Sequence, residues 1–327
     1  MKLRVLVSAY ILVSGLAWAQ TKPAAKWTPS RTPDGQPDLQ GMWTSATLTP
    51  LERPPDLAGK AVLTQAEADA YEQKMRRELN RDIPGSPASA GVGSYNEVWF
   101  DRGTKVAGGR RTSLIVDPPD GRVPPLTPEA QKRMDAAREY FKIHPADGPE
   151  DRPLPERCLV WPTAGPPMLP GPYNNNYQIF QTKDYVTILV EMIHDVRIIP
   201  LDGRPHLPSN IRQWLGDARG HWEGNTLVVE TTNFTNKTSD ISRGLQRPTF
   251  RGTDENLRLT ERFTRADAHT LLYEFTVNDP TAFTKPWTAQ IPMSKFAGPL
   301  YEYACHEGNY AMSGILNGAR AEEKKAK

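Results

Sequence analysis

The densest group of side chains that could carry out chemistry lies between residues 171 and 222. Three of the six histidines of the chain fall in this segment: His194, His206 and His221. A histidine titrates near neutral pH, and a nearby carboxylate can orient its ring for proton transfer. We therefore expect acid–base catalysis, with His194 as the acid or base. Glu191 or Asp217 would orient that ring, and His221 would assist.

Positively charged and flat side chains in the same segment predict that a small anionic or aromatic molecule binds there. An arginine fork binds a carboxylate through two hydrogen bonds, and tryptophan offers a flat apolar surface. The same arginines could instead form structural ion pairs with neighbouring acidic residues, and this alternative stays open. The expected ligand-binding residues are Arg197, Arg212, Arg219, Trp214, Asn176 and His206.

Glu261 is a secondary candidate for the acid. It alternates with the apolar residues Leu259 and Phe263 along an expected strand. A carboxylate among apolar neighbours should have a raised pKa. Pairing with Arg212 or Arg219 would make Glu261 structural instead.

Metal binding is the next possibility. The pattern Glu191-x-x-His194, with His206 and His221, could supply a carboxylate and imidazoles to a divalent metal. A strand does not bring residues three apart to one face, however, and the H-E-x-x-H motif is absent. The phosphate-binding loop, the nucleophile elbow and the dinucleotide-binding glycine motif are absent too. We therefore expect no organic cofactor and no metal.

The N-terminus predicts export. Lys2 and Arg4 precede a short apolar run over 5–16, and Ala17-Trp18-Ala19 is a small-x-small cleavage site. The expected signal peptide is 1–19, so the mature chain would be periplasmic or secreted, without an integral membrane segment. Cleavage leaves 38 of the 40 basic residues against 38 acidic ones. A near-neutral chain argues against nucleic acid as a partner.

The two cysteines, Cys158 and Cys305, predict a disulfide because exported proteins meet oxidising conditions. The bridge would close a loop of 147 residues (305 minus 158). Two buried free thiols are the alternative.

The distribution of proline divides the chain. Of its 31 prolines, 22 precede Gly171. Proline removes a backbone donor, so residues 20–170 are expected to be a proline-rich arm packed on the body. Two helices should interrupt it, because Thr64 with Glu67 forms a capping box and Thr127 precedes Pro128.

Alternation of apolar and polar residues predicts that 171–320 is an antiparallel β domain. The chain is therefore expected to be mainly β, with its meander closed as a calycin-like barrel, because closure removes exposed strand edges. A two-sheet sandwich is the alternative, and 321–327 should be a charged, disordered tail. The expected strands are Tyr177–Gln181, Tyr185–Met192, Arg197–Leu201, Arg212–Leu215, Gly220–Trp222, Leu227–Asn233, Leu257–Arg265, Thr270–Asn278, Trp287–Met293 and Leu300–Ala304.

Two long runs carry a resemblance. Residues 197–206 contain Asp-Gly-Arg-Pro-His, and 214–234 read Trp-Leu-Gly-Asp-Ala-Arg-Gly-His-Trp-Glu-Gly-Asn-Thr-Leu-Val-Val-Glu-Thr-Thr-Asn-Phe. With Glu-Arg-Phe-Thr-Arg at 261–265, they resemble a large family of exported, mostly uncharacterised bacterial proteins. The resemblance implies export and brings no catalytic residues. Many relatives carry His-Pro-His-Ser before the last of these motifs, and residues 250–256 lack it.

These observations favour an exported enzyme that acts on a small molecule by acid–base chemistry in a barrel pocket. Its reaction would be that of a lyase, an isomerase or a hydrolase. One alternative is a periplasmic protein that binds a small ligand without transforming it. Another is a structural envelope protein whose polar cluster is a buried salt-bridge network.

Overall fold

The computed structural model describes residues 27–88, 95–238, 253 and 255–325. The signal peptide expected at 1–19 lies outside these residues. The strands are β1 (Gly41–Thr44), β2 (Ile115–Asp117), β3 (Asn176–Gln181), β4 (Tyr185–Val190), β5 (Val196–Pro200), β6 (Asp217–Glu223), β7 (Thr226–Thr232), β8 (Arg258–Arg265), β9 (Thr270–Asn278) and β10 (Trp287–Lys295). The α-helices are α1 (Gln65–Glu78), α2 (Pro128–Ile143) and α3 (Ala311–Lys325).

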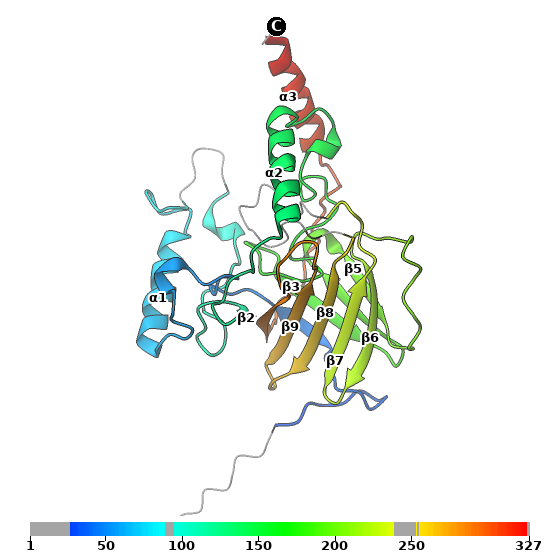
Figure 1. Ribbon diagram of the computed structural model, residues 1–327. Coiled ribbons are helices and arrows are strands. Elements are labelled where there is room, and N and C mark those ends of the chain that lie inside the picture. The colour runs from blue at the N-terminus through cyan, green and yellow to red at the C-terminus, as the bar shows by residue number, and fades with distance from the viewer. Residues whose placement is uncertain (1–26, 89–94, 239–252, 254, 326–327) are drawn as a thin grey trace, which may run out of the picture.

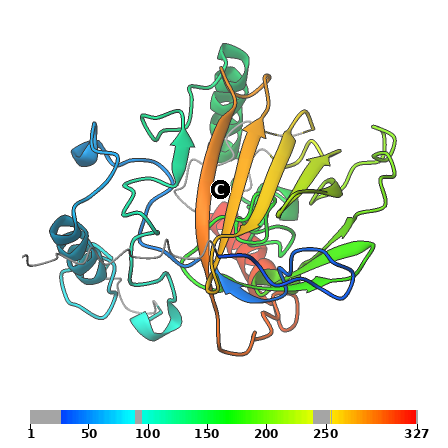
Figure 2. The same ribbon diagram turned by 90° about the horizontal axis from the view of Figure 1, so that it is seen from below.

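The strands form one antiparallel sheet that is nearly closed as a barrel, which confirms the expected fold class. The strand order is β5-β4-β3-β1-β10-β9-β8-β7-β6, and β2 adds to β10. Figure 2 shows the sheet curved into a ring when it is seen from below. At the seam between β5 and β6, a Cβ on Gly220 would lie 2.8 Å from Ile199 and 2.7 Å from Leu201. Side chains of β5 therefore pack directly on the backbone of β6 and close the seam.

Part of the proline-rich arm belongs to the barrel wall. Strand β1 pairs with β3 on one side and β10 on the other, so it joins two meanders that are far apart in sequence. Residues 38–49 contain no proline, which leaves every backbone N–H in this stretch available for pairing. Trp43 of β1 is fully buried and donates its indole N–H to Leu39 O at 3.0 Å.

Both expected helices are present with their predicted N-terminal signals. Thr64 and Glu67 form the capping box of α1, and Thr127 Oγ1 accepts from Ala130 N at 3.1 Å with Pro128 in the first turn of α2. Figure 1 shows α1 to one side of the barrel, and α2 and α3 projecting beyond one end of it. None of the helices in the described ranges combines the length and the apolar character needed to cross a bilayer.

The third helix, α3, is a correction to the expected tail, because it continues through residues 321–325. Gly314 and Gly318 weaken helix propensity and hide this helix from sequence patterns. In the structure Arg320 donates to the carbonyls of Ala146 and Asp147 at 2.9 and 3.0 Å, just beyond α2.

The structure has no strand at two of the expected positions, 212–215 and 300–304. Strands β5 and β6 run in the same direction, so residues 201–216 must return along the barrel between them. Residues 212–215 serve this crossover, where Gln213 makes only an isolated bridge to Phe234. Residues 300–304 form no strand either, and Tyr301 N–H instead donates to the Glu191 side chain at 3.0 Å.

A buried ion pair lies inside the apolar core of the barrel. Arg197 of β5 donates to both carboxylate oxygens of Glu261 of β8, at 3.0 and 2.5 Å. Tyr273 donates to the same carboxylate at 2.6 Å and accepts from Met168 N at 3.0 Å. The two charged side chains are 3% and 0% exposed. Burial by itself would lower the pKa of Arg197, but the charge and hydrogen bonds of Glu261 outweigh it and raise that pKa.

A reversal of direction between β4 and β5 explains why Arg197 points inward. Ile193 and His194 have positive φ of 62° and 50°, so the chain turns instead of continuing as one strand. Ile188 and Arg197 are then paired across the two strands and both are buried. A continuous strand would place them on opposite faces.

The predicted disulfide between Cys158 and Cys305 is confirmed, with a Cα–Cα distance of 5.7 Å. It joins the segment that contributes Met168 to the core to the segment that precedes α3. The bridge therefore holds these two segments next to each other.

We expect Glu261→Gln to lower the free energy of unfolding by about 3–5 kcal/mol, because it leaves the Arg197 charge buried and unpaired. The double variant Arg197→Met/Glu261→Leu should lose less, since it buries neither charge. Urea unfolding of both variants, with Glu230→Gln on the barrel exterior as a control, measures the difference. A Glu261→Gln protein as stable as the control would contradict this account.

We expect Cys158→Ser/Cys305→Ser to lower the free energy of unfolding by about 2–5 kcal/mol, because the unfolded chain gains the freedom of an open loop. Urea unfolding with and without dithiothreitol checks the cause. The reductant should destabilise the unmodified protein and leave the double variant unchanged.

Candidate functional site

The structure places the predicted site residues in three separate regions. The barrel interior holds Arg197 and Glu261. The crossover from β5 to β6 and the strand it leads into hold His206, Arg212, Trp214, Asp217, Arg219 and His221. The end of the barrel near the turn between β4 and β5 holds Asn176, Glu191 and His194.

Alternation along β6 separates its polar side chains from its core-facing ones. Gly220 faces β5 inside the barrel, so Asp217, Arg219 and His221 lie on the opposite, outer face. Gly216 immediately precedes the strand with φ of 70°, and a Cβ there would lie 2.7 Å from Thr231 and Thr232. Only glycine lets the backbone pass this close to Thr231 and Thr232. This approach brings Asp217 beneath the crossover.

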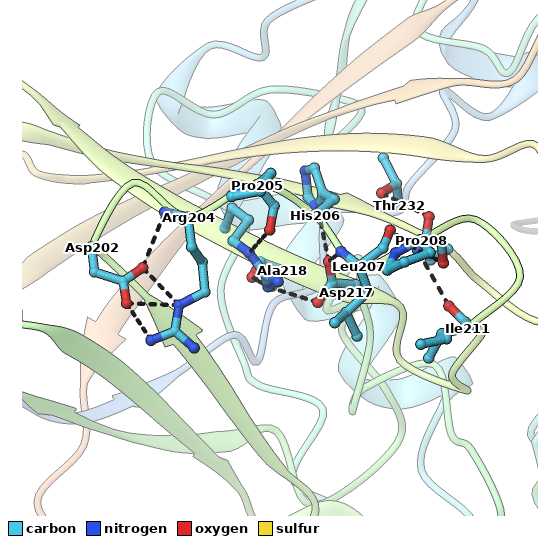
Figure 3. Close-up of polar contacts among 12 residues, drawn as sticks. Asp202, Arg204, Pro205, His206, Leu207, Pro208, Ile211, Asp217, Ala218 and Thr232 are labelled. Atoms are coloured by element: carbon cyan, nitrogen blue, oxygen red, sulfur yellow. Dashed lines mark hydrogen bonds and ion pairs between the residues drawn. The ribbon is translucent and has the colours of Figure 1, made fainter.

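Asp217 is the centre of the polar cluster on this outer face (Figure 3). Its Oδ2 accepts from Leu207 N at 2.9 Å and lies 2.9 Å from His206 Nδ1. Its Oδ1 accepts from Arg219 Nη1 at 2.6 Å. Burial alone would raise the pKa of Asp217, but the hydrogen bonds from Leu207, His206 and Arg219 outweigh it and lower that pKa. The carboxylate therefore stays charged beside the imidazole.

His206 is the histidine best placed for proton transfer. The carboxylate beside it is 5% exposed, whereas the His206 ring is 29% exposed and reaches solvent. With Nδ1–H donated to Asp217, the basic lone pair lies on Nε2. Within the described ranges, no hydrogen-bond partner occupies His206 Nε2.

Further contacts hold the crossover in place around His206. Arg219 Nε donates to Pro205 O at 3.0 Å. Asn233, at a positive φ of 59°, donates its amide to the carbonyls of Leu207, Pro208 and Ile211 at 2.9 to 3.2 Å. These bonds fix the backbone on both sides of His206, so the direction of its ring is set by the fold.

The other predicted members of this region are engaged elsewhere. Arg212 donates to Phe234 O and Glu255 O, both at 3.1 Å, and pairs with the Glu255 carboxylate at 3.3 Å. Trp214 packs half-buried against the core. His221 lies 3.3 Å from Glu223, and both side chains are exposed.

At the barrel end, Glu191 is buried and held by neutral donors. It accepts from Asn176 Nδ2 at 2.7 Å and from Tyr301 N at 3.0 Å. His194 is exposed, and its Nδ1 lies 3.0 Å from Tyr303 O, so a backbone carbonyl orients this ring. Glu191 and His194 therefore have different partners and do not form the expected pair.

Asp101 joins the barrel end, although sequence reasoning missed it. Asn175 donates to its carboxylate at 3.0 Å. Although part of Asp101 is exposed, desolvation of its carboxyl group, with a contribution from the charge of Glu191, raises its pKa to about 6. The asparagine run at 174–176 was the only available signal, because Asp101 itself lies in the proline-rich half of the sequence.

The part of the chain that the structure describes contains no cluster of side chains that could hold a metal ion. No three His, Cys, Asp or Glu side chains gather there as a metal ion would need. The cluster around Asp217 itself offers an imidazole oriented by a carboxylate, with the guanidinium of Arg219 bonded to the same carboxylate.

The raised pKa of Asp101 predicts a pH-dependent stability. Between the pKa of an unfolded aspartate, about 3.9, and about 6, the native state binds more protons, so stability falls as pH rises. Asp101→Asn should remove this fall, whereas Asp184→Asn, which lies away from Glu191, should keep it. Urea unfolding of each protein from pH 4 to pH 7 measures the slope, and equal slopes would contradict the assignment.

A comparison of the chain with protein-family models and with curated proteins finds no match. The resemblance to a family of exported bacterial proteins therefore stays a prediction. The geometry around Asp217 and His206 is what a functional proposal has to rest on.

Proposed function

We propose that this chain is an exported enzyme that transforms a small molecule by acid–base chemistry, with His206 as the group that transfers the proton. The observation that carries the proposal is the 2.9 Å contact between His206 Nδ1 and a buried, charged Asp217. A buried carboxylate of this kind fixes the tautomer of a histidine and stabilises its protonated form.

This proposal moves the acid–base role from His194 to His206. His194 has a backbone carbonyl as its partner, which cannot offset the charge of an imidazolium as a carboxylate does. His221 has a carboxylate partner, but water screens a pair in which both side chains are half exposed. Of the three, His206 is the one whose ring nitrogen lies within hydrogen-bond distance of a buried carboxylate.

In the proposed reaction, His206 Nε2 removes a proton from the substrate or from a water molecule. Asp217 stabilises the resulting imidazolium, which returns the proton to the leaving group or to another substrate atom. No oxidation is involved, so lyase, isomerase and hydrolase reactions are the candidate classes. No organic cofactor or metal enters this scheme.

The substrate is expected to be a small anionic or aromatic molecule. Arg204 lies two residues before His206, with its guanidinium 49% exposed and paired with Asp202. Arg219 lies on the other side of Asp217. Arg219, which bonds both Pro205 O and the carboxylate beside the imidazole, favours a substrate that carries a carboxylate.

A structural role is the second candidate, because the same contacts hold the crossover that covers the barrel seam. Asp217 binds Leu207 N–H and Arg219 as well as His206. A structural envelope protein would need these bonds for stability and would need no basic nitrogen facing solvent. A protein that binds a ligand without transforming it would need the arginines, and it too would need no basic nitrogen facing solvent.

Export is part of the proposal and rests on the signal sequence of residues 1–19. The disulfide between Cys158 and Cys305 supports it, because such bridges persist in oxidising compartments. A periplasmic or secreted location follows from the two together.

The test is turnover of a panel of small carboxylic acids and their esters, followed by NMR, with the mature chain and its variants. We expect His206→Gln to lower kcat by at least about 100-fold, because general acid–base catalysis contributes that much. His194→Gln and His221→Gln should retain turnover. Urea unfolding accompanies each assay, and His206→Gln should keep most of the stability of the unmodified chain.

Two results would reject the assignment. Full turnover in His206→Gln would exclude this residue as the proton-transfer group. A panel without turnover, combined with strong destabilisation of both His206→Gln and Asp217→Asn, would favour the structural role.

A further inference from the structure

A cavity of about 550 Å³ lies outside the barrel, between α1 and the segments that pack on the barrel wall. Helix α1 contributes Tyr71, Met75 and Leu79 to it. The remaining wall comes from residues 47–52, 161–162 and 169–172, which include Trp161, together with Arg102 and Leu114. This volume is in the range of pockets that hold small organic molecules.

The lining of this cavity is mainly apolar, and most of its polar groups are already bonded. The hydroxyl of Thr49 accepts from Ala107 N at 2.8 Å, and Glu52 accepts from Val123 N at 3.0 Å. The side chains of Tyr71 and Trp161 are half-buried, so the cavity reaches solvent. Desolvation in this setting raises the pKa of Tyr71, which keeps its hydroxyl a hydrogen-bond donor.

The charged residues of the cavity lining are Glu52 and Arg102, and Arg102 is paired with Glu97. Its Nη1 donates both to Leu79 O at 3.0 Å and to Glu97 at 2.6 Å, and its side chain is 16% exposed. The guanidinium also lies 4.3 Å from the centre of the Phe100 ring. Within the described residues, Arg102 Nη2 has no hydrogen-bond partner, so the fork is held in place with donors to spare.

The helix that forms one wall is anchored to the body by a buried carboxylate. Glu72 of α1 accepts from Val106 N at 3.1 Å and pairs with Lys105 at 2.8 Å. These contacts fix α1 at a distance from residues 47–52 and 161–172. The cavity is therefore a feature of the fold, not a gap left by a loosely attached helix.

We propose that this cavity binds an aromatic or otherwise apolar small molecule that carries one anionic group. The apolar part would contact Met75, Leu79 and Trp161, and the anion would accept hydrogen bonds from Arg102. Burial of apolar surface supplies most of the affinity, and the charge-assisted bond to the guanidinium orients the ligand. This site is separate from His206, and neither site depends on the other.

Two fluorescent probes test the proposal on the full mature chain. 8-Anilinonaphthalene-1-sulfonate carries an anionic group, and N-phenyl-1-naphthylamine has a similar ring system without one. We expect both to bind, and Met75→Trp to weaken both by at least about tenfold, because the larger side chain fills the cavity. Ala66→Trp, on the exposed opposite face of α1, is the matched control and should leave binding unchanged.

Arg102→Gln separates the anionic contact from the apolar one. It should weaken the sulfonate probe about tenfold, the value of one charge-assisted hydrogen bond, and leave the uncharged probe nearly unaffected. Near-ultraviolet circular dichroism and urea unfolding verify that each variant is folded. Met75→Phe is a milder filling variant if Met75→Trp is unstable.

Several outcomes would overturn the proposal. Equal binding of both probes by folded Met75→Trp and Ala66→Trp would place them elsewhere. An equal effect of Arg102→Gln on the two probes would remove the anionic group from the ligand class. Loss of binding in His206→Gln would move the ligand to the crossover, so the two sites are tested separately.

Discussion

The ion pair between Arg197 and Glu261 is the interaction on which the barrel depends. Two charges without water are stable only when every donor and acceptor around them is placed correctly. The pair meets this requirement through strands near both ends of the sheet, β5 and β8, and through Tyr273 with the backbone of Met168. A displacement of β5 or β8 would separate the two charges, and a displacement of Tyr273 would remove a hydrogen bond from the carboxylate. The pair thus selects one register and one degree of closure for the sheet.

Placing that pair in the barrel centre determines where chemistry is available. The charged side chains of the interior are bonded to each other and to Tyr273, whereas the accessible polar groups lie on the outer face, where the crossover from β5 returns to β6. There Asp217 is shielded by backbone and guanidinium groups while His206 stays accessible. The cavity beside α1 is likewise outside the barrel. The barrel supports both candidate sites and contains neither of them.

The sequence predicted features whose signals lie within a few residues of one another. Two-residue alternation located most strands, and the Thr64–Glu67 box located α1. The predictions failed where distant segments decide the outcome. Two residues with positive φ, Ile193 and His194, reverse the chain and turn Arg197 inward, and no local pattern announces this. The residues near the proposed site were named, but their partners, such as Asp217 for His206, depend on a crossover whose path only the fold reveals.

The position of β1 has a consequence for how the chain reaches its native state. Trp43 lies opposite Lys295, a separation of 252 residues (295 minus 43), so the first strand of the wall pairs with the last. Contacts between such distant segments form slowly, because a long loop must close before they contribute stability. The wall is therefore completed only when residues as far apart as 41 and 295 are both available to pair. Until then the unpaired edges of β3 and β10 can pair with the wrong strands.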